Sequence, residues 1–216
     1  MEKERKILSL LGLPGCGKGT QGELLAKKTG AKIYGMGDLI RKEIESCDLT
    51  DPFCAEIKER YDKGIPQPDE IAIDIVKKNL TSVDGDIILD NFPFTAKQSD
   101  LFFELCKQLN IDNYLCVWIK LSPESAISRI LNRKICSSCR KVYIGSEETI
   151  CEVCGGALIS RADDKEEVVK NRISIYKPNI DEVVEVFREK GRLIEIDGEK
   201  SIAEVEKEIE DKVING

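Results

Sequence analysis

Short runs of apolar residues alternate with longer amphipathic segments along most of the chain. Five runs predict strands, and several are apolar at every position, as is typical of parallel strands covered on both faces. The predicted strands are Ile7–Leu11, Lys32–Tyr34, Asp86–Asp90, Tyr114–Lys120 and Arg192–Asp197. Between and after them, with a break or kink at Pro178, the pattern predicts helices at Lys18–Thr29, Gly37–Ser46, Pro52–Lys63, Asp69–Leu80, Thr95–Leu109, Pro123–Lys134, Asp163–Tyr176, Asp181–Lys190 and Ile202–Val213. This alternation predicts an α/β fold, a five-stranded parallel sheet with helices on both faces.

Two segments interrupt this alternation of strands and helices. Residues 36–66 are helical and polar, and residues 134–160 contain cysteine, glycine and serine with short strand-like runs. Ligands bind beyond the carboxyl ends of the strands in such sheets, and both segments follow strands there. We therefore predict a core of residues 1–35, 67–133 and 161–216 that carries two mobile inserts, 36–66 and 134–160, able to close over a site.

Composition limits the partners that the chain is expected to bind. The 216 residues are 41% hydrophobic, enough for one sizeable core, and the net charge is −7 with no histidine. This acidity argues against nucleic acid as the main partner. The charged first residues and the short apolar runs predict neither a signal peptide nor a membrane span. We expect a cytoplasmic monomer without a membrane partner, whose nine cysteines are reduced rather than paired in disulfides.

A glycine-rich segment directly after the first predicted strand indicates phosphate binding. It reads Gly12-Leu-Pro-Gly-Cys-Gly-Lys-Gly-Thr-Gln21 and contains the G-x-x-x-x-G-K pattern. Glycines let backbone N–H groups turn towards phosphates, and the following helix adds its positive N-terminal dipole. Lys18 is placed to reach the outer phosphates. The hydroxyl that usually follows the lysine directly comes one residue later, at Thr20, because Gly19 lies between them.

The Gly-Lys-Gly-Thr-Gln sequence resembles the nucleoside monophosphate kinases, and the adenylate kinase family in particular. Further blocks resemble that family in type and in order, over nearly the whole chain. They are Gly37-Asp38-Leu39-Ile40-Arg41, Gly64-Ile-Pro-Gln-Pro-Asp69-Glu70, Asp90-Asn91-Phe92-Pro93-Phe94 with Gln98, Arg129-Ile-Leu-Asn-Arg133, Arg161-Ala-Asp163-Asp164 with Arg172, and Asp197-Gly198-Glu-Lys200.

The resemblance implies a P-loop kinase that transfers the γ-phosphoryl group of ATP to AMP and gives two ADP. The residue types agree with this chemistry, because phosphoryl transfer requires positioning and charge stabilisation rather than a protein nucleophile. A lysine and several arginines provide that charge. Two alternatives stay open: a kinase for another nucleoside monophosphate, and a nucleotide-binding relative with weakened catalysis.

The resemblance also implies a role for each matched residue. Lys18, Arg133, Arg161 and Arg172 are the expected catalytic residues. Thr20 and Asp90 are expected to hold Mg²⁺. ATP is expected at Gly12, Gly15, Cys16, Gly17, Lys18, Gly19, Thr20, Arg129, Arg133 and Lys200. AMP is expected at Met36, Gly37, Arg41, Gln67, Asn91, Phe94, Gln98, Arg161 and Arg172.

Three positions depart from the family on the side of the acceptor. Asn91 and Phe94 replace a glycine and an arginine, and Met36 replaces a common threonine. Another cation such as Lys97 could substitute, the acceptor could be a different nucleotide, or the enzyme could be slow. We favour AMP as the acceptor because of Gln98, since relatives that act on UMP or CMP usually have asparagine there.

Four clustered cysteines predict a metal site in the second insert. Cys136 and Cys139 form one C-x₂-C pair, and Cys151 and Cys154 form another, with eleven residues between the pairs. Such pairs supply four thiolates to tetrahedral Zn²⁺ and leave no open position, so the zinc is expected to be structural. The alternative is a set of unliganded thiols. Some adenylate kinases have such a lid.

Overall fold

The computed structural model describes residues 5–48, 50–63, 65–81, 83–161 and 164–215. Its main sheet has five parallel strands in the order β2-β3-β1-β4-β8. These strands are β1 (Lys6–Leu11), β2 (Lys32–Gly35), β3 (Ile87–Asp90), β4 (Asn113–Lys120) and β8 (Leu193–Asp197). The predicted five-stranded parallel sheet is therefore confirmed, with strand ends shifted by only one residue.

Helices connect these strands. They are α1 (Lys18–Thr29), α2 (Met36–Ser46), α3 (Pro52–Asp62), α4 (Asp69–Leu80), α5 (Ala96–Gln108), α6 (Pro123–Leu131), α7 (Glu166–Glu189) and α8 (Ile202–Ile209), which continues into the π-helical segment η1 (Glu210–Ile214). Among the described helices, none combines the length and apolar character needed to cross a membrane.

Of the predicted break or kink at Pro178, the break is wrong, because α7 runs through this proline as one helix. Proline removes the hydrogen bond to the carbonyl of Ser174, but Ser174 is exposed and water can reach that carbonyl. On both sides of the proline, α7 buries apolar residues such as Ile173 and Val184 against the core. This burial outweighs the lost hydrogen bond. Asp163, where a helix was expected to begin, lies outside the described residues.

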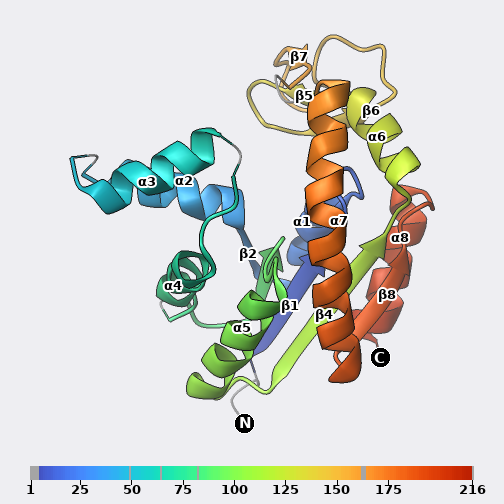
Figure 1. Cartoon of the computed structure of the whole chain (residues 1–216). Coiled ribbons are helices and arrows are strands. Elements are labelled where there is room, and N and C mark those ends of the chain that lie inside the picture. Colours follow the sequence, from blue (N-terminus) through green and yellow to red (C-terminus); the bar gives the residue numbers. More distant parts are fainter. Residues whose placement is uncertain (1–4, 49, 64, 82, 162–163, 216) are drawn as a thin grey trace.

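Two apolar clusters cover the two faces of the main sheet. In β1, Leu8 and Leu10 belong to the cluster that includes residues of α1, α6 and α8, whereas Ile7 and Leu11 belong to the cluster with α4 and α5. Side chains alternate between the faces of a strand, so this division places helices on both sides. Helix α7 contributes to both clusters and runs along the sheet (Figure 1).

Two structural units stand apart from the main sheet. Helices α2 and α3 project to one side, and a small antiparallel sheet lies beyond the amino-terminal end of α7 (Figure 1). This small sheet has the order β6-β5-β7 and consists of β5 (Arg133–Cys136), β6 (Val142–Ile144) and β7 (Leu158–Ile159). We call α2 and α3 the helical insert and the small sheet with its loops the lid.

The expectation that all nine cysteines are reduced is wrong for one pair. Cys47 and Cys54 form a disulfide, with their Cα atoms 5.8 Å apart. Helix α2 ends at Ser46 and α3 begins at Pro52, so the chain reverses between them. This reversal brings the two Cα atoms within the range that a disulfide spans. Composition alone could not reveal the reversal.

Candidate active site

The segment between β1 and α1 curls tightly around its own backbone. Gly12 has a φ of 154°, and a Cβ atom there would lie 2.6 Å from both the Cys16 Sγ and the Ile119 carbonyl oxygen. Gly17, with a φ of 93°, precedes the first turn of α1. The Lys18 Nζ donates a hydrogen bond across the loop to the Gly12 carbonyl oxygen at 3.3 Å. The loop therefore directs Lys18 back over its own concave side, as a phosphate-binding loop requires.

Asp90 ends β3 beside this loop. It lies opposite Leu10 in the register of β1 and β3, and a Cβ atom on Gly19 would be 3.9 Å from the Asp90 Oδ2. The Oδ1 atom is buried and has no hydrogen-bond partner within the described part of the chain. Burial raises the pKa of the Asp90 carboxyl, while Lys18 acts in the opposite direction. Thr20 follows Gly19 in the first turn of α1, so a hydroxyl and a buried carboxylate flank the loop.

The charge of Lys18 is influenced by several neighbouring ionisable groups. Burial alone would lower its pKa, but Cys16 and Asp90 raise it above the ordinary value. The lysine therefore carries its positive charge at neutral pH. Arg172 also acts electrostatically on Lys18, and Arg129 acts on Cys16, so both arginines lie near the loop.

The cations other than Lys18 that were predicted to bind ATP have protein partners in this structure. The guanidinium of Arg133 donates two hydrogen bonds to Asp164, from Nε at 2.7 Å and from Nη2 at 2.6 Å. Lys200 pairs with Glu208 of α8 at 2.8 Å. Arg129 donates to the Glu199 carbonyl oxygen at 3.4 Å.

On the acceptor side, the chain leaves β3 through a left-handed residue. Asn91 has a φ of 63°, which explains why glycine suits this position and why asparagine replaces it at small cost. Its backbone N–H donates to the Leu10 carbonyl oxygen at 3.0 Å. Its side-chain Oδ1 is buried and accepts no hydrogen bond from the residues that the structure describes.

Phe94 and Gln98 are joined by a hydrogen bond. The backbone N–H of Phe94 donates to the Gln98 Oε1 at 2.8 Å, and the Gln98 Nε2 donates to Asp69 at 2.9 Å. Gln98 is only 3% exposed. The amide is therefore held in one orientation, with one N–H and one oxygen lone pair left over.

The structure disfavours Lys97 as a replacement for the arginine that Phe94 displaces. Lys97 pairs with Glu70, and its side chain is 60% exposed. The Phe94 ring, by contrast, is buried against Tyr176.

The helical insert holds Arg41 through two contacts. Its Nη1 donates to the Tyr61 hydroxyl at 2.8 Å, and the guanidinium also pairs with Asp38. A Cβ atom on Gly37 would lie 3.7 Å from the Arg41 Nη1, so the glycine leaves room beside the arginine. Met36 begins α2 and packs against the core.

Gln67, which follows the helical insert, is buried. Its Nε2 donates to the Ile57 carbonyl oxygen at 2.9 Å. Its Oε1 is buried and has no hydrogen-bond partner among the described residues. Arg161 lies between the lid and α7, and its carbonyl oxygen accepts from the Asp164 backbone N–H at 3.1 Å.

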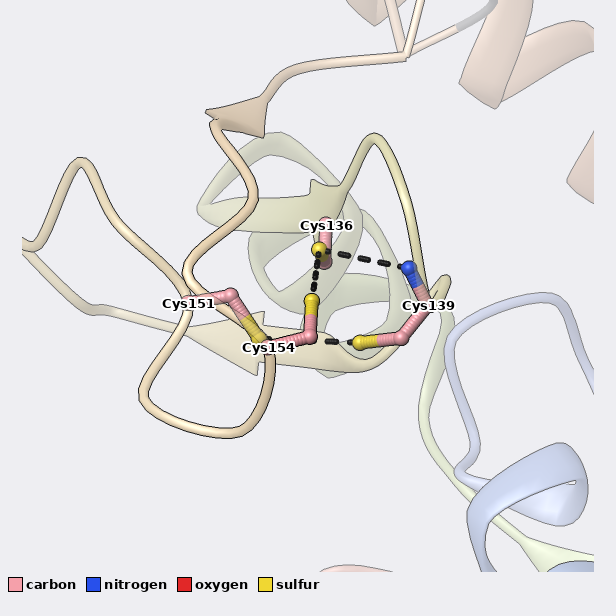
Figure 2. Close-up of side chains that lie close together, drawn as sticks. All are labelled: Cys136, Cys139, Cys151 and Cys154. Atoms are coloured by element: carbon pink, nitrogen blue, oxygen red, sulfur yellow. Dashed lines mark hydrogen bonds between the residues drawn. The ribbon is translucent and has the colours of Figure 1, made fainter.

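The four lid cysteines converge on one point (Figure 2). Their sulfur atoms all lie within 4.8 Å of one another. The Cys136 and Cys154 sulfurs are 3.4 Å apart, and those of Cys139 and Cys151 are 3.6 Å apart. Zinc–sulfur bonds of about 2.3 Å in a tetrahedron separate the sulfurs by roughly 3.8 Å. The cluster therefore has the size and the ligand type of a zinc site.

Hydrogen bonds favour the thiolate form of two of these sulfurs, those of Cys136 and Cys151, whereas hydrogen bonds with the neighbouring cysteines and burial raise the pKa of Cys139 to about 12. The backbone N–H groups of Ser138 and Cys139 both donate to the Cys136 Sγ at 3.4 Å, and the Cys139 bond contributes most to the lowered pKa of Cys136. A hydrogen bond with the Tyr143 hydroxyl, at 3.2 Å, lowers the pKa of Cys151 to about 6, although burial acts in the opposite direction.

Comparison with known proteins gives this arrangement a family. The family model described as "Adenylate kinase" matches residues 10–192. The chain belongs to the adenylate kinase family. It is 37% identical over 211 residues to the adenylate kinase of Archaeoglobus fulgidus, covering 94% of this chain and 95% of that one. It is 34% identical over 209 residues to the adenylate kinase of Acetivibrio thermocellus, with 94% and 95% covered.

Several residues that contact the predicted site residues of this adenylate kinase were missed from the sequence. Asp164 holds Arg133, and Tyr61 holds Arg41. Tyr176 lies four residues after Arg172, a spacing that places two side chains on one helix face, and this signal could have found it. Tyr61 and Arg41 lie on different helices, and no spacing rule links them.

Proposed function

We propose that this adenylate kinase transfers the γ-phosphoryl group of ATP to AMP and yields two ADP. The observation that carries the proposal is the surroundings of Lys18 in a phosphate-binding loop: Asp90 and Arg172 act electrostatically on Lys18, and Arg129 acts on Cys16 of the same loop. Charge in this arrangement stabilises the transferring phosphoryl group, and no protein nucleophile is required.

ATP would bind on the P-loop side. The loop N–H groups and Lys18 would hold its phosphates, while Arg129 and Lys200 would border its base. Thr20 and the unpartnered Oδ1 of Asp90 would hold Mg²⁺. When bound, Mg²⁺ neutralises charge on the phosphate oxygens.

AMP would bind between the helical insert and the end of β3. Arg41 would bind its phosphate, and Gln98 would contact its base. Two protein hydrogen bonds fix Gln98, and the remaining N–H and lone pair complement the adjacent acceptor and donor on the adenine edge. This supports AMP as the acceptor, although Met36 and Phe94 differ from the family.

Closure of the two inserts would complete the site. We propose that the helical insert, residues 36–66, and the lid, residues 134–160, move over the bound nucleotides. Arg133, Arg161 and Arg172 would then converge on the transferring phosphates. For Arg133 this requires exchange of its Asp164 carboxylate for phosphate oxygens, and both are bidentate partners for a guanidinium.

A structural Zn²⁺ would hold the lid together through Cys136, Cys139, Cys151 and Cys154. The buried apolar cluster of the lid contains only two of these cysteines and Leu158. A segment with so small a core needs a covalent or metal cross-link for stability.

A coupled assay of ADP formation tests the function. The enzyme receives Mg-ATP with AMP, GMP, CMP, UMP or no acceptor, and Lys18→Met serves as the matched inactive control. We expect AMP to be the preferred acceptor. If the enzyme prefers another monophosphate, that nucleotide replaces AMP as the proposed acceptor. If no ADP forms with any of the four acceptors, the proposed phosphotransfer is refuted. Cytoplasmic location and a monomeric state stay predictions, and light scattering checks the latter.

A further inference from the structure

A stack of side chains joins the acceptor side of the site to α7. The ring of Phe94, in the loop after β3, lies 4.7 Å from the ring of Tyr176 on α7, with an angle of 59° between their planes. On the same helix, the guanidinium carbon of Arg172 lies 6.0 Å from the centre of the Tyr176 ring. Both separations fall within the ranges in which aromatic pairs and cation–π pairs are attractive.

The stack lies at the reaction site rather than on the outer surface. Phe94 is buried, Tyr176 and Arg172 are partly buried, and both residues of α7 act electrostatically on Lys18. Phe94 is also fixed from its backbone side by the hydrogen bond to Gln98. The Tyr176 ring therefore rests on a rigid partner and presents a face to Arg172.

We propose that Tyr176 is a positioning residue, which Phe94 holds in place and which in turn holds the guanidinium of Arg172 towards the P-loop. Where the family has an arginine, this chain has an aromatic ring that contributes no charge of its own. The ring instead fixes the position of a charge supplied by α7. The inference rests on the proposed function, because it assumes that Arg172 stabilises the transferring phosphoryl group.

The expected effect follows from the strength of a cation–π contact. In a partly desolvated site such a contact contributes enough to change a rate about 10-fold, if it is needed only in the transition state. Tyr176→Leu should therefore lower kcat about 10-fold and leave KM for ATP and AMP within about twofold. Tyr176→Phe keeps the ring and should keep kcat within about twofold.

The chain offers a matched control. Tyr114 also lies under a cation, with the Arg192 guanidinium carbon 5.1 Å from its ring centre, but it belongs to the opposite end of β4 from the site. Tyr114→Leu removes the same groups and should lower the melting temperature without lowering kcat. A change in kcat that is specific to Tyr176 therefore separates positioning from general stability.

A double-mutant cycle tests the chain of contacts. In an Arg172→Ala background, Tyr176→Leu should change kcat less than twofold, because the cation that it positions is gone. Phe94→Leu should lower kcat in the same direction as Tyr176→Leu. If Tyr176→Leu does not fold, Tyr176→Met and Phe94→Leu provide the same comparison.

Three results would overturn the proposal. They are an undiminished kcat in Tyr176→Leu, an equal loss in Tyr176→Phe, and a full 10-fold effect of Tyr176→Leu in the Arg172→Ala background. Each of these leaves an active wild-type enzyme and so leaves the proposed function intact. A wild-type protein without activity on any monophosphate would overturn the function as well.

Discussion

Removal of Asp164 should destabilise the protein strongly, because it leaves a shielded arginine without its partner. The Asp164 side chain is 3% exposed and that of Arg133 is 14% exposed, and two hydrogen bonds at 2.7 Å and 2.6 Å join them. Breaking one side of a buried ion pair costs about 3–5 kcal/mol. Because Arg133 keeps some contact with water, we expect the low end, about 3 kcal/mol, for Asp164→Ala. This corresponds to a fall in Tm of roughly 6–12 °C.

Urea unfolding measures this effect, with the m-value as a check that the unfolded state is unchanged. Asp181→Ala is the matched control, because Asp181 pairs with Lys177 on the same helix and both side chains are about half exposed. The control should change the free energy of unfolding by less than about 1 kcal/mol. Equal effects of the two substitutions, or a loss below about 1 kcal/mol for Asp164→Ala, would show that the Arg133–Asp164 pair is not the buried contact described above.

Three further predictions concern the proposed magnesium and zinc sites and the AMP side of the active site. Burial raises the pKa of Asp90 in the folded protein, so the charged carboxylate destabilises the fold at pH values above the unfolded-state pKa. In the absence of nucleotide, Asp90→Asn should therefore raise Tm at pH 7 but not below about pH 4. An unchanged Tm at pH 7 would contradict this prediction. Cys151→Ser should reduce bound zinc from about one per chain to near zero by metal analysis, whereas Cys106→Ser, a buried cysteine outside the cluster, should keep it. Phe94→Arg should lower the AMP-dependent rate about 10-fold, because it removes the ring that packs on Tyr176 beside Arg172; a faster variant would show that only a charge was missing.

Local patterns were enough to predict the sheet, because continuous apolar runs bounded by polar turns have few other stable arrangements in a chain of this size. The P-loop was equally clear, since glycines, lysine and the following helix are adjacent in sequence. The four cysteines were found for the same reason, and the structure brings them together.

Contacts between distant segments could not be predicted in this way. The partners Asp164 and Arg133 are separated by the whole lid, and the contact joins Phe94 in the loop after β3 to Tyr176 in α7, which are far apart in the sequence. The continuity of α7 through Pro178 also depends on tertiary burial, which local propensity does not include. Similarly, the Cys47–Cys54 bond depends on the reversal of the chain between two helices.

The disulfide of the helical insert and the thiolate cluster of the lid respond to different reagents. A phosphine reductant would open Cys47–Cys54 and leave the lid cysteines reduced, whereas a chelator would withdraw the proposed zinc from the lid and would not cleave a disulfide. The cross-link on each side of the nucleotide site can therefore be removed by a different reagent. Treating the unmutated protein with one reagent at a time would destabilise the helical insert or the lid separately and would show which of the two limits turnover.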